Sequence, residues 1–96
     1  MDPFAGFEWD AHKARANLRK HGVDFAAAVA AFEDEQALTI RDEVSAIDEQ
    51  RYLSVGRDVR ARILVVAYTW RGNGIRLFSA RRATASERRQ YLEQDR

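Results

Sequence analysis

The segment that most constrains the fold is residues 62–70, RILVVAYTW. Every residue from Ile63 to Tyr68 is apolar, and most of them are β-branched or aromatic. An unbroken apolar run of this length, without polar alternation, is typical of a strand that is covered on both faces. The sequence therefore predicts a sheet with this segment as its central strand.

Three further segments are predicted to pair with it. Residues 71–74, RGNG, read as a tight turn, so residues 75–83 are expected to return antiparallel to the central strand. Residues 51–57, RYLSVGR, and residues 37–42, ALTIRD, alternate as strands do. The polar and acidic residues 43–50 between those two strands are predicted to form a loop.

Helix signals precede the strands. Asp10 is a favourable N-cap for a helix that ends at Gly22, and Asp24 is a favourable N-cap for a second helix over residues 25–32. Phe25 and its partners at helical spacing give this second helix an apolar face.

The two ends of the chain complete the pattern. Residues 7–10, FEWD, are predicted to begin with a short strand, and Thr84 with Glu87 forms a capping box that opens a final helix. The order is a short strand, two helices, four antiparallel strands and a helix. This order predicts a single α+β domain over residues 1–96, with the helices packed on one face of a four-stranded antiparallel sheet.

Composition excludes several kinds of site. The chain has no cysteine, which excludes disulfides, thiolate ligands and a cysteine nucleophile, and two histidines alone make a structural zinc site improbable. We therefore expect neither a metal nor a cofactor. No apolar run approaches the roughly 18 residues of a membrane span, and no signal peptide is evident, so we predict a soluble cytoplasmic protein.

The charge is distributed unevenly. Residues 1–50 contain 5 Lys and Arg against 11 Asp and Glu, whereas residues 51–96 contain 11 Arg against 4 Asp and Glu. Arginine binds phosphate through a planar fork, so a basic half of this composition favours a polyanionic partner, either nucleic acid or an acidic protein segment. The alternative interpretation is that these charges only solvate exposed strands and a helix.

An ordered set of motifs resembles a known family. The motifs are FEWD, KHGVDF, RYLSVG, ILVVAYT and SARRAT, together with Lys13 and Asn17. Their order and spacing over residues 7–91 resemble the BrnT family, the ribonuclease toxins of bacterial type II toxin–antitoxin pairs. The resemblance implies a RelE-like fold and RNA cleavage that halts translation. It also implies a ribbon-helix-helix antitoxin, which acts on DNA for the pair, in a complex with two copies of each chain.

RNA cleavage without a metal depends on cations aimed at the phosphate, assisted by proton transfer. Arg81 is the first candidate, because RelE-like folds place a phosphate-contacting arginine at the end of the last strand. Arg82, Arg76 and Arg62 are further catalytic candidates, since an antiparallel turn at RGNG brings Arg62 towards Arg81 and Arg82. For Arg81 and Arg82 the alternative is that only one binds phosphate while the other pairs with an acidic residue. For Arg62 the alternative is an ordinary exposed arginine at the start of a strand, without a role in catalysis.

Strict alternation predicts which face of the last strand each side chain occupies. It groups Leu77, Ser79 and Arg81 on one face, and Arg76, Phe78, Ala80 and Arg82 on the other. A β-bulge in this strand would break that grouping.

Tyr91 is the last catalytic candidate, at a place where RelE-like toxins carry a catalytic tyrosine; the alternative is an aromatic that anchors the final helix. Trp9, His12 and Lys13 are predicted to bind RNA, Trp9 by stacking on a base. The alternative for Trp9 is core packing, and for His12 and Lys13 an exposed helical position. His12, Lys13 and His21 are also candidates for proton transfer, and the alternative for His21 is an interaction with the last carbonyls of its helix.

A second class of function fits the same residues. The basic face would then belong to a module without enzymatic activity that binds nucleic acid or docks an antitoxin. A binding arginine contributes a fraction of the affinity, whereas a transition-state arginine is needed for turnover, and this difference separates the two hypotheses.

Overall fold

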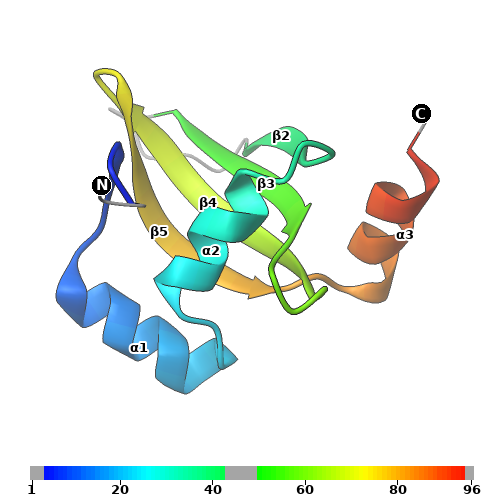
Figure 1. Cartoon of the computed structure of the whole chain (residues 1–96), viewed down its shortest axis with the longest axis horizontal. Helices are drawn as coiled ribbons and strands as arrows, with labels where there is room; N and C mark the ends of the chain where they lie inside the picture. Colours follow the sequence, from blue (N-terminus) through cyan, green and yellow to red (C-terminus); the bar gives the residue numbers. More distant parts are fainter. Residues whose placement is uncertain (1–3, 43–49, 95–96) are drawn as a thin grey trace.

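The computed structural model describes residues 4–42 and 50–94 as a mixed sheet with three helices (Figure 1). The elements in chain order are β1 (Phe7–Glu8), α1 (Ala11–His21), α2 (Phe25–Phe32), β2 (Leu38–Asp42), β3 (Arg51–Arg57), β4 (Ile63–Arg71), β5 (Gly74–Arg82) and α3 (Ala85–Glu93). This α+β architecture and the order of its elements confirm the prediction. The predicted acidic loop lies, apart from Gln50, outside the described residues.

The sheet has five strands and not the four that we predicted. Its order is β1-β5-β4-β3-β2, and β1 pairs with β5 in parallel, with Phe7 opposite Ile75. The Ile75 N–H donates to the Gly6 carbonyl oxygen at 2.8 Å. The predicted antiparallel set is correct for β2 to β5 but incomplete, because the two-residue β1 occupies the edge of β5 that would otherwise stay unpaired.

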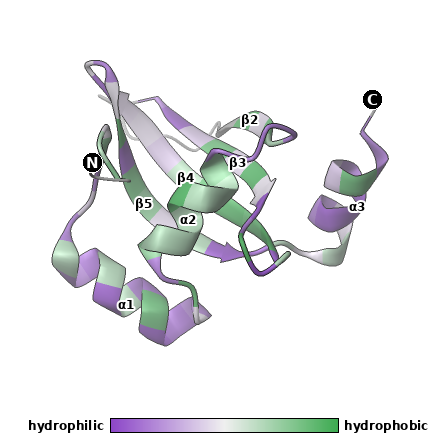
Figure 2. Cartoon of the chain, in the orientation of Figure 1, coloured by the Kyte–Doolittle hydropathy of each residue, from purple (hydrophilic) through white to green (hydrophobic). Residues whose placement is uncertain are grey.

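Strand β4 is the central strand, as its apolar run predicts. Leu64, Val65 and Val66 are each no more than 2% exposed. Helix α2 covers one face of the sheet, and its surface is apolar along its length (Figures 1 and 2). The packing is close enough that a Cβ built on Gly56 of β3 would lie 2.0 Å from the Ala31 carbonyl oxygen, so only glycine fits there.

The helix caps form where the sequence places them. The carboxylate of Asp10 accepts the backbone N–H groups of His12 and Lys13, and these hydrogen bonds lower its pKa. Gly22 ends α1 in the left-handed region at φ 69°. The capping box of α3 has both of its hydrogen bonds, between Thr84 and Glu87.

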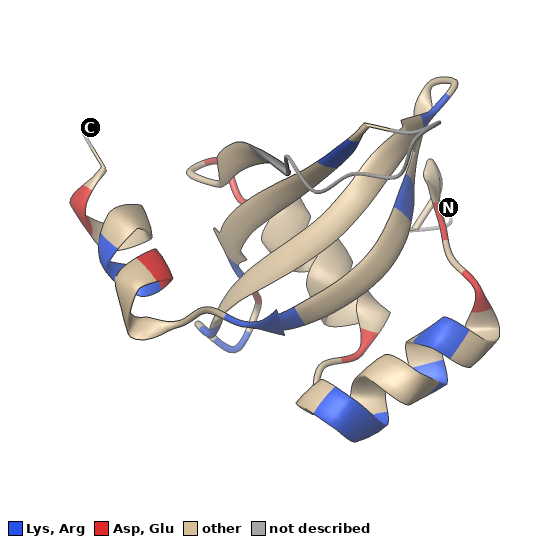
Figure 3. Ribbon diagram, turned by 180° about the vertical axis from the view of Figure 1, so that it is seen from behind, with Lys and Arg blue, Asp and Glu red and all other residues tan. Residues whose placement is uncertain are grey.

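Helix α3 packs on the face of the sheet opposite α2, which we call the open face, so the prediction that the helices share one face is wrong. Helix α1 lies along the β5 edge of the sheet, where its Ala14 packs against the core under α2. Seen from the open face, α1 and α3 flank the strands at opposite sides (Figure 3). A smaller core joins α3 to the open face, where Tyr91 packs against Val55, Ile63 and Val65. The open face is therefore bordered by two helices and crossed by neither.

A β-bulge in β5 corrects our assignment of its faces. Ala67 pairs with Ser79 and Tyr68 with Leu77, so Phe78 is the extra residue. Leu77 and Ala80 consequently both join the core under α2, although strict alternation separates them. By the same register, Arg76, Ser79 and Arg81 lie on the open face with Thr69, Ala67 and Val65 of β4. The predicted grouping was wrong because one inserted residue reverses the parity of all that follow.

Candidate nucleic-acid interface

A groove of about 370 Å³ runs between α1 and the sheet, and we call it the α1 groove. Its lining comes from three elements: Lys13, Ala16, Asn17, Lys20 and His21 of α1, Arg51 of β3, and Phe78 and Ser79 of β5. The groove combines three cationic side chains and a histidine with one aromatic ring. No carboxylate is among these lining residues, so the groove is suited to an anion.

The helical spacing of α1 arranges its side of the groove. Lys13, Asn17 and Lys20 recur at intervals of four and three residues, and such positions share one helix face. Asn17 fixes that face to the sheet. It is buried, its amide donates to the carbonyl oxygens of Val23 at 2.9 Å and Ala80 at 2.8 Å, and it accepts from the Ala80 N–H at 3.0 Å. The helix turns that carry Lys13 and Lys20 are thus held beside β5.

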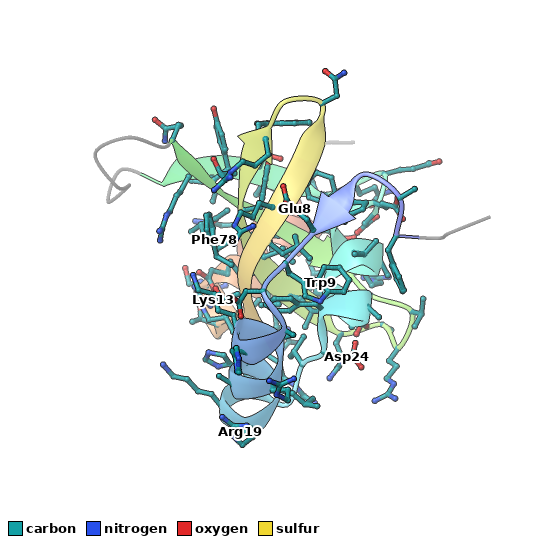
Figure 4. All side chains as sticks on the ribbon, turned by 90° about the vertical axis from the view of Figure 1, so that its left-hand side faces the viewer. Glu8, Trp9, Lys13, Arg19, Asp24 and Phe78 are labelled. Atoms are coloured by element: carbon teal, nitrogen blue, oxygen red, sulfur yellow. The ribbon has the colours of Figure 1, made fainter. Side chains whose placement is uncertain are left out.

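Phe78 projects into the groove because it is the bulged residue of β5. The guanidinium carbon of Arg51 lies 4.3 Å from the centroid of its ring, and the Lys13 ammonium lies 5.3 Å from it. Lys13 and Phe78 occupy one side of the β5 edge, and Trp9 the other side, beside α2 (Figure 4). The buried Nε of Arg51 has no hydrogen-bond partner among the described residues.

Arg76 and Arg81, two of the predicted catalytic residues, flank the groove on the open face. Arg76 pairs with Glu8 at 3.2 Å, and Arg81 makes a two-pronged pair with Glu87, at 2.7 Å and 2.9 Å. The hydrogen bonds from Arg81 lower the pKa of Glu87 to about 2, and the same pair raises the pKa of Arg81. Both arginines are therefore fixed in position by a carboxylate.

The pairing does not exhaust the hydrogen-bonding capacity of Arg81. Its Nη atoms donate to both oxygens of Glu87, and Nη1 also donates to the Arg82 carbonyl oxygen at 3.3 Å. A guanidinium has five N–H donors, so Nε–H and one Nη2–H have no partner in these bonds. Arg81 can thus still contact a phosphate oxygen, at the cost of sharing its charge with Glu87.

Arg62 and Arg82 lie apart from the α1 groove. Both line a second hollow of about 330 Å³, the α3 cavity, together with Arg57, Ala61, Ile63, Ala83, Arg88 and Leu92. Arg62 is held by Asp58 at 2.8 Å. Burial acts to raise the pKa of Asp58, but hydrogen bonds from the backbone and side chain of Arg62 outweigh it and lower that pKa. The structure therefore divides the predicted arginines between two places.

Tyr91 is 2% exposed and its hydroxyl donates to Asp34 Oδ2. Burial acts to raise the pKa of Asp34, but the bond from Tyr91 and the backbone N–H groups of Gln36 and Arg57 lower it on balance. This arrangement ties α3 to the loop after α2, which fits the anchoring alternative for Tyr91. No comparison tests its catalytic role, which stays a prediction.

The remaining predicted residues differ in their surroundings. Lys13 lines the groove, whereas His12 is exposed beside it, with its Nδ1 3.0 Å from Arg15 Nη2. Trp9 packs edge-to-face on Phe4 and Phe25, with ring centroids 5.8 Å and 5.7 Å apart, against the core under α2. The contacts of Trp9 match the packing alternative.

Sequence reasoning missed Arg51, Lys20 and Phe78 as groove residues. Arg51 and Phe78 lie on β3 and β5, which are separated by β4, so only the tertiary structure brings them together. Lys20 carried a detectable signal, because it recurs on the helix face of Lys13. Phe78 carried none, since the bulge that turns it into the groove has no signature in IRLFSARR.

Two features are absent from the described residues. Within residues 4–42 and 50–94, no cluster of three or more His, Cys, Asp or Glu side chains has the geometry to hold a metal ion. No helix in the same part of the chain is long and apolar enough to cross a membrane.

Comparisons with known proteins agree on one family. The family model described as the ribonuclease toxin BrnT of type II toxin–antitoxin systems matches residues 9–87. The crystal structure of the Brucella abortus ribonuclease toxin BrnT is similar to this chain, with a TM-score of 0.66 and 26% sequence identity over 81% of this chain and 95% of that one. A search of curated proteins finds no significant match. Since the family model covers most of the chain, the protein belongs to the BrnT family, the ribonuclease toxins of type II toxin–antitoxin systems.

Proposed function

We propose that the protein is an endoribonuclease that binds RNA in the α1 groove and cleaves it without a metal ion. The observation that carries this proposal is the convergence on Phe78 of Arg51 and Lys13, from two different elements, inside a groove that His21 also lines. Unstacked RNA bases bind on aromatic rings and guanidinium planes, and phosphates bind lysine and arginine. The groove therefore offers one site for an RNA base, at Phe78, and several cationic sites for the phosphates of the RNA backbone.

The proposed cleavage is an attack of the ribose 2′-hydroxyl on the adjacent phosphate. A bond forms between the 2′-oxygen and phosphorus, the bond to the 5′-oxygen breaks, and one proton moves from the 2′-hydroxyl to the leaving oxygen. Charge that develops on the phosphate is stabilised best by fixed cations. Arg81 and Arg76 supply such cations on the open face, because Glu87 and Glu8 hold them in place.

The proposed proton-transfer group, His21, is a residue of the groove lining. Histidine exchanges protons near neutral pH, and His21 lines the groove beside Lys20. The catalytic roles predicted for Arg62, Arg82 and Tyr91 are not needed for this proposal. Arg62 and Arg82 lie at the α3 cavity, and the Tyr91 hydroxyl is engaged by Asp34.

We infer the wider system from the family. RNA cleavage would inhibit translation in the cytoplasm, and a ribbon-helix-helix antitoxin would neutralise the toxin in a complex with two copies of each chain. A RelE-like relationship is supported by the antiparallel strands β2 to β5 with helices at their flanks, although the parallel β1 is an addition to that pattern.

The test is cleavage of a defined RNA by the purified protein in EDTA, compared with Arg81→Ala and with Arg71→Ala as a matched control. Arg71 is exposed in the β4–β5 hairpin, away from the groove. We expect the wild type and the control to cleave, and Arg81→Ala to lose about 10²–10³-fold in rate. Activity that disappears in EDTA and returns with a divalent cation would show that the metal-free mechanism is wrong.

The alternative function is a binding module that uses the same cations without catalysis. It is favoured if the wild type binds RNA but leaves it intact, and if Arg81→Ala lowers the affinity and its salt dependence by a fraction.

A further inference from the structure

The α3 cavity differs in chemistry from the groove and shares no residue with it. Its lining has two halves, the arginines Arg57, Arg62, Arg82 and Arg88 and the apolar residues Ala61, Ile63, Ala83 and Leu92. The arginines come from β3, the loop after it, the end of β5, and α3. Neither a carboxylate nor an aromatic ring is among these eight residues.

The positive charge of this cavity is only partly compensated. Arg62 pairs with Asp58, and the Arg57 guanidinium lies 5.7 Å from the ring centroid of Tyr91. In the part of the chain that the structure describes, no ion pair is found for Arg82 or Arg88, and both are exposed. Four guanidinium groups around one hollow repel each other, so an anionic ligand is favoured there.

The apolar half of the lining indicates that the anionic ligand also carries apolar groups. Leu92 is 45% exposed, although it faces the cavity beside the buried Ile63. A second hollow of about 290 Å³ continues along α3 and shares Arg88 and Leu92 with the first. This continuation adds Ala85, Arg89 and one carboxylate, Glu93, to the lining. The surface is therefore an elongated track of arginines and aliphatic side chains in which Glu93 is the one acidic group among the lining residues.

This composition favours a protein ligand over RNA. The phosphates of RNA could pair with the arginines, but its bases would have no aromatic ring in the cavity lining on which to stack. RNA would also leave Leu92 and Ile63 without an apolar partner. A peptide that carries both carboxylates and aliphatic side chains satisfies both halves, and such pairing of arginine with apolar anchors is typical of protein interfaces.

We propose that the α3 cavity and its continuation along α3 form the docking surface for an acidic segment of the antitoxin that also carries aliphatic side chains. This inference rests on the toxin–antitoxin function of the family. It assigns RNA and the antitoxin to different surfaces, with Phe78 and Arg51 serving the first, and Arg88 and Leu92 the second. The antitoxin is then anchored beside α3 through contacts that RNA does not use.

The test uses the full-length toxin and the purified antitoxin encoded beside its gene. Affinity is measured by titration calorimetry at two salt concentrations for the wild type, Arg88→Glu and Arg88→Glu/Leu92→Asp, with Arg71→Glu as the charge-matched control. We expect Arg88→Glu to weaken antitoxin binding about 10-fold and to reduce its salt dependence, and the double variant to weaken it about 100-fold. RNA cleavage without antitoxin should stay within about twofold of the wild type for Arg88→Glu, and melting curves check that each variant is folded.

The outcomes show whether the α3 cavity binds the antitoxin or RNA. If Arg88→Glu weakens RNA binding and leaves the antitoxin affinity unchanged, the cavity belongs to RNA and the proposal is overturned. It is equally overturned if neither affinity changes. If the wild type cleaves no RNA but Arg88→Glu still weakens antitoxin binding, the ribonuclease proposal fails while the docking surface stands.

Discussion

The α1 groove and the α3 cavity are both lined by cations, yet they differ in what accompanies the charge. In the groove, Arg51 and Lys13 lie over the ring of Phe78, and His21 is close by. In the cavity, Arg82 and Arg88 lie beside Leu92 and Ile63. Charge alone selects an anion, and the neighbouring uncharged side chain selects which kind. An aromatic favours a base, and an aliphatic favours a peptide.

The helices that border these two regions are also fastened differently. Asn17 fixes α1 to β5 through two hydrogen bonds with the backbone of Ala80, and a third joins it to the Val23 carbonyl oxygen in the loop before α2. Helix α3 is fastened by side chains, Tyr91 to Asp34 and Glu87 to Arg81. Backbone partners cannot move without moving the sheet, so the groove should be the more rigid of the two surfaces.

The largest expected effect is on catalysis. Replacing both Lys13 and Arg51 with alanine should lower kcat/KM for RNA about 10²–10³-fold, because the cations at Phe78 are lost. The matched variant Arg57→Ala/Arg88→Ala removes two cations from the α3 cavity and should change the rate about twofold or less. Single-turnover cleavage measures both. Equal losses in the two double variants would contradict the proposal that RNA binds in the α1 groove and not in the α3 cavity.

The next effect is on stability through the anchor of α1. Asn17→Ala leaves the buried N–H and carbonyl of Ala80 without a partner and should lower the free energy of unfolding by about 2–4 kcal/mol. Urea denaturation measures this change. Gln90→Ala, an exposed polar truncation on α3, serves as the control and should stay within about 0.5 kcal/mol of the wild type.

The anchor of α3 should be weaker. Tyr91→Phe removes the hydroxyl that Asp34 accepts, and we expect a loss of about 1–2 kcal/mol in the free energy of unfolding. Cleavage is then measured under conditions where the variant is fully folded. A rate that falls further than the unfolded fraction explains would restore the catalytic role predicted for Tyr91 from the sequence.

The smallest effect concerns pH. The pKa of Glu87 is about 2 in the folded protein, against an ordinary value of 4.5, so the unfolded chain binds its proton first as the pH falls. The stabilisation is complete above pH 4.5 and is lost as the pH falls towards 2. Glu87→Gln should therefore show a shallower decline of stability over that range, by about 1 kcal/mol or less for a pair that is partly exposed to solvent. Identical pH profiles of the two proteins would mean that the pair with Arg81 contributes nothing.

Much of the fold was predictable, because local rules set it. The run from Ile63 to Tyr68 predicted a central strand, and the capping residues Asp10, Asp24 and Thr84 placed the helix starts. The parallel pairing of β1 was not predictable, since two residues carry no periodicity from which a partner can be inferred.

The candidate site was predictable in part. Lys13 and Arg76 were identified from type and position, and Arg81 from the resemblance to RelE-like folds. The structure places Lys13 in the groove and both arginines on the open face beside it. Arg51 and Phe78 were not identified, and Arg62 and Arg82 were grouped with Arg81 although they line another cavity.

The sequence by itself determined the elements, the central strand and the accumulation of arginine in the second half of the chain, because these follow from periodicity, capping and composition. Only the tertiary structure decided which cations meet. The bulge at Phe78 reverses the parity of β5 after it, and β4 separates the strands that bring Arg51 and Phe78 together. Faces and neighbours of this kind depend on register and strand order, which are set by contacts between residues far apart in the sequence.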